Sequence, residues 1–89
     1  PMPSAFAAQA APKRHVQLGW SDVPRETGYE LQRSPRADFG RNVATFNPLA
    51  DTTAFTDTNL HRGKTYFYRL RACNAVGCSA YTTTSATTY

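Results

Sequence analysis

The chain lacks the features that mark membrane proteins, helical proteins and structural metal sites. No apolar run approaches the roughly 20 residues that a membrane-spanning helix requires. Nowhere in the 89 residues does the apolar spacing of one helix face persist for about ten residues. The four ligands of a zinc site are also missing, because the two cysteines lie far from His15 and His61 in the sequence. We therefore predict no membrane insertion, no helical fold and no bound metal.

Charge is sparse and evenly spread. Charged residues make up 18% of the chain, and 10 Lys and Arg against 6 Asp and Glu give a net charge of +4. The basic residues are scattered from Lys13 to Arg71 without a block of like charges, which is typical of solvated faces. A nucleic-acid-binding surface gathers its cations on one stripe, with free aromatic rings between them. The sequence thus predicts no nucleic-acid partner.

Motifs for catalysis and cofactor binding are missing too. The sequence contains neither a Gly-x-Ser-x-Gly segment nor a glycine-rich loop that could hold a phosphate. We expect His15 and His61 to be solvated, because they fall at the start of a strand and in a turn. Asp57 in "FTDTN" is expected to cap a turn by accepting hydrogen bonds from nearby backbone amides. These observations predict a protein that is not an enzyme and needs no cofactor.

The sequence does contain short segments in which apolar and polar residues alternate. In residues 15–20, "HVQLGW", every second side chain is apolar, as in a half-buried strand. The alternation recurs in residues 29–33, 43–46, 54–57 and 64–72, which are separated by turn residues. A weaker segment at residues 4–9 and the Thr-rich tail after Gly77 bring the count to about seven strands. The pattern predicts an all-β sandwich of antiparallel strands.

Several of these segments resemble a fibronectin type III domain. Trp20 lies where that family keeps the tryptophan of its second strand, and "GYELQR" resembles the third strand. The most characteristic match is "TAFTDTNL" followed by "RGKTYFYRLRACNAVG". The resemblance covers most of the chain and implies one immunoglobulin-like β-sandwich domain over residues 1–89. Residues 1–12 would form a weak first strand or a linker.

The alternation and the resemblance together predict the core. On this alignment Tyr66 is the corner tyrosine, whose hydroxyl bonds to the backbone of the preceding turn. The side chains expected to face the core are Trp20, Tyr29, Leu31, Phe55, Leu60, Tyr66, Tyr68 and Leu70.

Cys73 and Cys78 bracket the loop "NAVG", whose Asn and Gly favour a tight hairpin turn. An even number of cysteines at facing hairpin positions favours a disulfide formed in an oxidising compartment. Two free thiols in a cytosolic protein are the alternative. A bridge that closes so short a loop is worth roughly 2 kcal/mol. Through the resemblance, the cysteine pair is typical of fibronectin type III domains of bacterial secreted multidomain proteins.

These expectations define three functional hypotheses. The first is a monomeric, extracellular or secreted accessory module that spaces, orients or stabilises neighbouring domains of the same polypeptide. The second is a weak polysaccharide- or protein-binding module that uses the outer face of the third and sixth strands, with Glu30, Phe67, Arg69 and Arg71. Cross-strand ion pairing of Glu30 with one of the arginines is the simpler interpretation of that face. The third is a fragment of an animal adhesion or receptor ectodomain.

Overall fold

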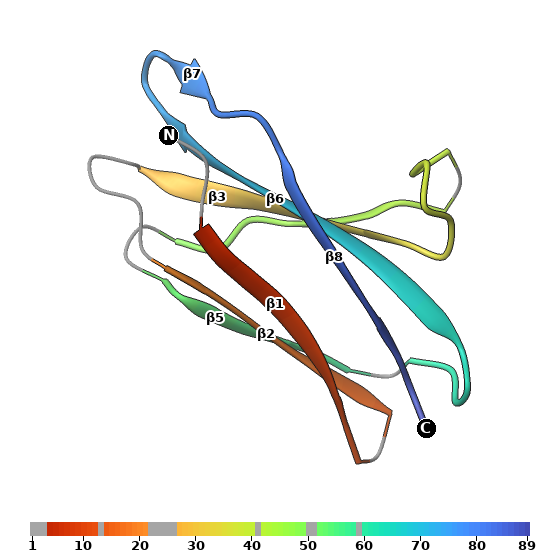
Figure 1. Ribbon diagram of the computed structural model, residues 1–89. Coiled ribbons are helices and arrows are strands. Elements are labelled where there is room, and N and C mark those ends of the chain that lie inside the picture. The colour runs from red at the N-terminus through yellow and green to blue at the C-terminus, as the bar shows by residue number, and fades with distance from the viewer. Residues whose placement is uncertain (1–3, 13, 22–26, 41, 50–51, 59) are drawn as a thin grey trace.

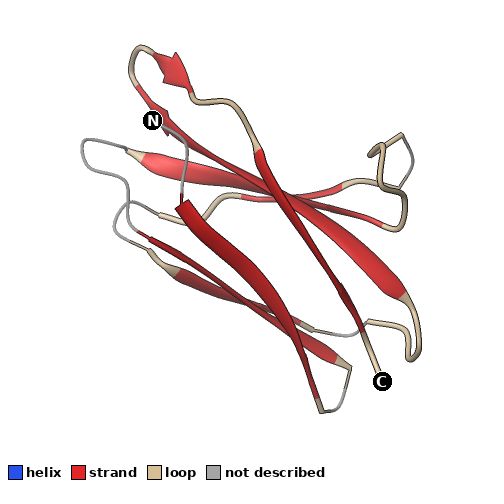
Figure 2. Cartoon of the chain, viewed as in Figure 1, coloured by secondary structure: helices blue, strands red, loops and turns tan. Residues whose placement is uncertain are grey.

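All regular structure in the described part of the chain is β-strand (Figure 2). The computed structural model describes residues 4–12, 14–21, 27–40, 42–49, 52–58 and 60–89. Within these residues no helix is long and apolar enough to cross a membrane.

The strands form two antiparallel sheets that face each other (Figure 1). The smaller sheet has the order β1-β2-β5, with bounds Ser4–Ala11, His15–Ser21 and Ala54–Asp57. The larger sheet has the order β4-β3-β6-β7, and β8 also pairs with β6. Its strands are β3 (Gly28–Ser34), β4 (Ala44–Phe46), β6 (Thr65–Asn74), β7 (Gly77–Cys78) and β8 (Thr82–Thr87). The predicted all-β, immunoglobulin-like sandwich is thereby confirmed.

β6 organises the core because its side chains alternate between the inside and the outside of the sandwich. It pairs with β3 on one side and with β7 and β8 on the other. Burying these apolar side chains between the sheets is the main favourable term in the stability of such a fold. Phe55 is half-buried and packs against the rim of the core. The buried apolar residues are Val16, Leu18, Trp20, Tyr29, Leu31, Leu60, Tyr66, Tyr68, Leu70 and Ala72.

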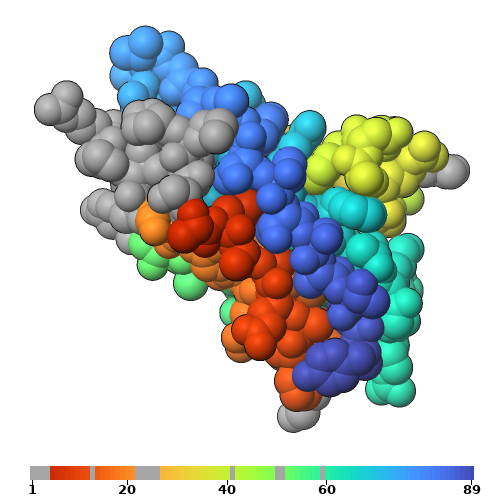
Figure 3. Space-filling view, in the orientation of Figure 1, coloured from red at the N-terminus to blue at the C-terminus, as the bar shows by residue number. Residues whose placement is uncertain are grey.

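β1 is a full strand, although its sequence offers only one large apolar side chain. It pairs with β2 from Ala7 to Ala11, and the register shifts between Ser4 and Ala7. The ring of Phe6 meets Trp20 edge-on, with 6.2 Å between centroids. On one face of the molecule β1 lies beside β8, which belongs to the other sheet (Figure 3). β1 is therefore held both by its own sheet and by contact with β8.

The turn before β6 is fixed by two side chains. The Tyr66 hydroxyl accepts a hydrogen bond of 2.8 Å from the His61 amide, the contact that a corner tyrosine makes. The Thr88 hydroxyl accepts a bond of 3.1 Å from the Lys64 amide and donates to the His61 carbonyl. Gly63 has a φ of 68°, a conformation that glycine adopts without a steric penalty. The turn is thus tied both to β6 and to the end of the chain.

Asp57, which was expected to cap a turn, has its described partners in the opposite sheet. Its side chain is buried, with 4% of the residue exposed, and it points between the sheets. The carboxylate accepts hydrogen bonds from Arg33 at 2.7 and 2.8 Å and from the Tyr68 hydroxyl at 2.9 Å. A carboxylate at this depth needs a cation and donors, and β3 and β6 supply them from the opposite sheet. We call Arg33, Asp57 and Tyr68 the buried clamp.

Candidate functional site

The outer face of the larger sheet carries the polar residues that the sequence singled out. Glu30 pairs in register with Arg71, and Gln32 with Arg69, across β3 and β6. Arg71 forms an ion pair with Glu30 at 2.6 Å. The Nε atom of Arg69 instead donates to the Gln32 side-chain oxygen at 2.6 Å. Among the described residues, Arg71 therefore pairs with an acid, whereas the hydrogen-bond partner of Arg69 is neutral.

Two aromatic residues that sequence reasoning missed complete this face. The Arg69 guanidinium carbon lies 4.4 Å from the ring centroids of both Phe39 and Tyr81. The corresponding Arg71 atom lies 4.7 Å from the Tyr81 ring. We call Phe39, Arg69, Tyr81 and Arg71 the aromatic–arginine row. Each cation sits over at least one ring face, an arrangement worth about 0.5–1 kcal/mol per contact at an exposed site.

Tyr81 links the row to the ion pair beside it. Its hydroxyl donates a hydrogen bond to the Glu30 carboxylate, which also accepts from Arg71. Burial raises the pKa of Tyr81 above its usual range, and the hydrogen bond to Glu30 acts in the same direction. The hydroxyl consequently keeps its proton to a higher pH than an ordinary tyrosine does. Glu30 is thus fully engaged and offers little to a ligand.

Phe67, which was expected to be an exposed ring, is half-buried. It lines a pocket of about 240 Å³ together with Phe39 and Ala37 from the β3–β4 loop and Thr83, Thr84 and Ser85 from β8. The pocket therefore combines two aromatic rings with a set of hydroxyl-bearing side chains. Of the four residues predicted for this face, Arg69 stacks on a residue of this pocket, while Glu30 and Arg71 pair with each other.

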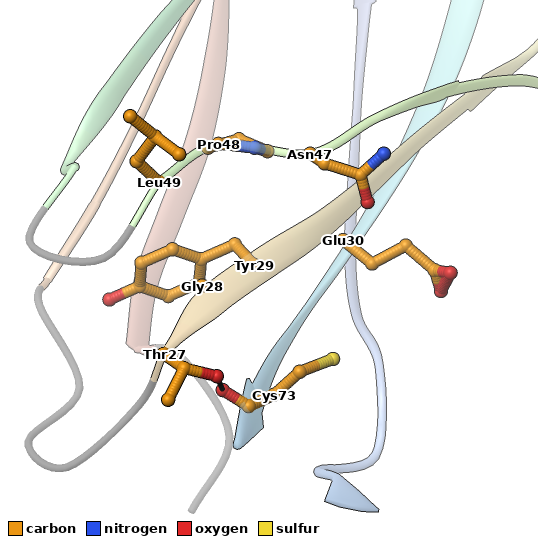
Figure 4. Close-up of a pocket in the computed structure, with 8 residues that line it drawn as sticks. All are labelled: Thr27, Gly28, Tyr29, Glu30, Asn47, Pro48, Leu49 and Cys73. Carbon is orange, nitrogen blue, oxygen red and sulfur yellow. Dashed lines mark hydrogen bonds between the residues drawn. The ribbon is translucent and has the colours of Figure 1, made fainter. Parts of the chain in front are cut away.

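A second pocket, of about 290 Å³, lies beside the start of β3 (Figure 4). Thr27 donates to the Cys73 carbonyl through both its amide, at 2.8 Å, and its hydroxyl, at 3.2 Å. The Tyr29 amide donates to the Pro48 carbonyl at 2.9 Å. Glu30 also lines this pocket, but its carboxylate is taken up by Arg71 and Tyr81. The described residues that line the second pocket thus include no uncommitted charged group.

Cys73 and Cys78 form a disulfide across paired positions of β6 and β7, with their Cα atoms 4.0 Å apart. Asn74 shapes the hairpin tip, because its side-chain oxygen accepts hydrogen bonds from the amides of Val76 and Gly77. The bridge fastens this hairpin and no other element.

The described residues contain no cluster of three or more His, Cys, Asp or Glu side chains that could hold a metal ion. His61 is exposed and His15 is partly exposed. Among the described residues, the ionisable group most strongly perturbed is the Tyr68 hydroxyl: burial raises its pKa, and the neighbouring Asp57 raises it further. This tyrosine has no exposed surface, and its bond to the Asp57 carboxylate joins the two sheets.

The positions of Phe39 and Tyr81 on the outer face could not be predicted from the sequence, for physical reasons. Phe39 lies in the turn cluster "SPRADFGRN", where no alternation assigns a side chain to a face. Tyr81 belongs to a tail rich in Thr and Ser, whose inward and outward positions look alike. Tyr81 could have been placed only from the register of β6 and β8, in which Thr83 lies opposite Arg69 and Tyr81 therefore lies near Arg71. That register depends on tertiary pairing, which the tail sequence does not specify.

Comparison with known proteins assigns the sandwich to the fibronectin type III fold. The structure superimposes on the fn3 domain of the human collagen alpha-1(XX) chain with a TM-score of 0.88, at 20% identity over 99% of this chain and 84% of that one. It superimposes on FN3tt with a TM-score of 0.81, at 27% identity over 98% of this chain and 91% of the other.

In sequence, the chain is 30% identical over 80 residues to the Kelch domain-containing protein SSO1033 of Saccharolobus solfataricus. The match covers 90% of this chain but only 10% of that relative's length. No family model matches the sequence.

Proposed function

We propose that this chain is a non-catalytic accessory module that spaces and orients neighbouring domains of a secreted or surface multidomain protein. The observation that carries the proposal is the path of the outer strands. β1 begins at one end of the sandwich, and β8 finishes at the opposite end (Figure 1). Domains joined to these two strands would be held apart by the length of the sandwich, whose longest dimension is 38 Å.

The two ends are held by contacts that resist local opening. β8 pairs with β6 from Thr82 to Thr87, and Thr88 then bonds to the turn before β6. β1 pairs with β2 over five consecutive positions, Ala7 to Ala11. A spacer transmits orientation only if its end strands stay paired, and this arrangement meets that requirement.

Two further observations support a place in a multidomain protein outside the cytosol. The chain spans a tenth of the archaeal relative's length, as expected of one module among several. The disulfide favours a location outside the reducing cytosol, where such bridges are rare. The partners proposed here are therefore neighbouring domains of the same polypeptide, and the module itself is a monomer spanning residues 1–89.

Replacing the module within its parent polypeptide tests the proposal. The substitute is a Gly/Ser linker, which behaves as a flexible coil. We expect the flanking domains to keep their individual activities but to lose their fixed relative orientation, measured by small-angle X-ray scattering. A matched control inserts an unrelated fibronectin type III domain at the same place, which should preserve the separation. Unchanged scattering with the flexible linker contradicts the spacer role.

A second candidate function is weak binding of a polysaccharide or protein by the outer face of β3 and β6. The specific observation in its favour is Arg69, which pairs with no acid among the described residues and lies next to a pocket lined by Phe39 and Phe67. Retention on insoluble polysaccharides that disappears in a double variant, Phe67→Ala with Arg69→Ala, is the expected result. Equal retention of the parent and the variant contradicts binding at this face.

A further inference from the structure

The pocket beside Phe67 exists because the loop after β3 folds back over the outer face of the sheet. The Arg36 amide donates to the Ser34 hydroxyl at 3.1 Å, and the Phe39 amide donates to the Arg36 carbonyl at 3.1 Å. The Asp38 carboxylate accepts from the Gly40 amide at 2.9 Å and pairs with Arg36 at 3.3 Å. These local bonds place the Phe39 ring against Arg69.

Phe39 is held in an unusual backbone conformation. Its φ is 54°, in the left-handed region that bulky residues rarely enter. Such a conformation persists only where the surroundings enforce it, and here the bonds of the β3–β4 loop do so. Here it makes the Phe39 ring a wall of the pocket that Phe67 also lines.

The lining suits a sugar ring. Aromatic faces pack against the C–H faces of a pyranose, while side-chain hydroxyls exchange hydrogen bonds with its hydroxyl groups. Phe39 and Phe67 supply the rings, and Thr83 and Ser85 supply exposed hydroxyls. At about 240 Å³ the pocket is smaller than the roughly 300–1,000 Å³ typical of sites for drug-sized ligands. It therefore fits one ring of a longer polymer.

Arg69 adds a preference for negative charge. Among the described residues, only its Nε has a hydrogen-bond partner, the neutral Gln32, so the two terminal nitrogens remain available. Two acids of the neighbouring elements are engaged elsewhere: Glu30 on β3 pairs with Arg71, and Asp38 in the β3–β4 loop pairs with Arg36. A planar guanidinium with two free donors matches a carboxylate in a bidentate geometry.

We propose that this pocket binds a uronate residue of an acidic polysaccharide, with Phe39 and Phe67 against the sugar ring and Arg69 against its carboxylate. The proposal deepens the second candidate function and rests on it. It names the ligand class, which that function leaves open, and it places the ligand between the β3–β4 loop and β8.

Isothermal titration of the chain with polygalacturonate and with its fully methyl-esterified form tests the proposal. The two polymers share a backbone and differ in carboxylate charge. We expect the acid form to bind at least about tenfold more tightly, as for loss of one charge-assisted contact. Arg69→Gln and Phe39→Ala should each weaken binding of the acid form by about tenfold or more. Both are surface changes, and unchanged melting curves verify that the variants fold.

Arg62→Ala is the matched control, because it removes the same charge from the exposed turn before β6. It should leave the affinity unchanged. The proposal is overturned in favour of diffuse charge attraction if Arg62→Ala and Arg69→Gln lose equal affinity for polygalacturonate. It is also overturned if the chain binds a single-stranded oligonucleotide as tightly as it binds polygalacturonate. Equal binding of acid and ester forms overturns the uronate preference and leaves polysaccharide binding intact. No binding of either polymer overturns this inference, whereas the second candidate function is decided by the retention experiment on insoluble polysaccharides and the spacer role stands.

Discussion

The carboxylate of Asp57 on β5 accepts a hydrogen bond of 2.9 Å from the hydroxyl of Tyr68 on β6, joining the two sheets through a buried charge. Arg33 on β3 completes the clamp with an ion pair of 2.7 Å. The guanidinium lies 5.7 Å from the rings of Phe46 and Tyr66, so apolar groups surround it as well. The clamp fixes how the sheets face each other, and the positions of the outer strands depend on that arrangement.

Asp57→Ala should destabilise the protein strongly. It leaves Arg33 and Tyr68 facing the interior without an acceptor, and breaking a buried pair on one side costs about 3–5 kcal/mol. Urea unfolding followed by tryptophan fluorescence measures the loss. Asp38→Ala is the control, since that carboxylate pairs with Arg36 at the surface, and its unfolding midpoint should stay close to that of the parent. Similar midpoints for both variants contradict a structural role for the clamp.

Stability should fall in alkaline solution. An unfolded tyrosine loses its proton near its ordinary pKa of 10.0, whereas Tyr68 in the folded chain has a raised pKa and keeps it. Above that pH the folded state binds more protons than the unfolded state, so the free energy of unfolding decreases as the pH rises. Tyr68→Phe should reduce the slope, and Tyr81 should maintain part of it because its pKa is raised too. A slope that Tyr68→Phe leaves unchanged contradicts this assignment.

Trp20→Ala should come close to unfolding the domain. The indole meets Tyr29 edge-on at 5.5 Å between centroids and is 6% exposed, so truncation leaves a cavity between the sheets. Large-to-small changes of this kind cost about 3–5 kcal/mol, a large share of a small domain's stability. Thermal unfolding by circular dichroism gives the shift. A melting temperature equal to the parent's contradicts the inward position of this side chain.

The disulfide should stabilise the hairpin without being required for folding. Replacing both Cys73 and Cys78 by Ser should lower the free energy of unfolding by roughly 2 kcal/mol, because the bridge closes a short loop. The double variant should keep the β-sheet circular dichroism spectrum of the parent. Before reduction, a thiol reagent should label neither sulfur of the folded parent chain. Rapid labelling of both would argue against an oxidising compartment.

Much of the fold was predictable because apolar and polar residues alternate along the strands. In β6, Tyr66, Tyr68 and Leu70 point inward as their spacing indicates, and Trp20 does so in β2. Each of these positions is fixed by a local pattern of period two, which a single sequence displays. The shared outer face of the third and sixth strands followed from the resemblance to a known domain, and β3 does pair with β6.

Features that depend on contacts between distant segments could not be predicted. Asp57 sits in a stretch that suggests a turn, and only the fold brings Arg33 and Tyr68 to it. Phe39 acquires its place on the outer face through loop bonds and a left-handed backbone, neither of which has a sequence period. A candidate site assembled from a loop and two strands therefore emerges only in three dimensions.

The central claim is that the sandwich holds its first and last strands at a fixed separation. Double electron–electron resonance between nitroxide labels on bio-orthogonal side chains at Ala5 and Tyr89 measures that separation. We predict one narrow distance distribution, within the 38 Å length of the molecule and unchanged by polygalacturonate. A broad distribution, or two distances that exchange, would contradict a module that keeps its neighbours in fixed orientation.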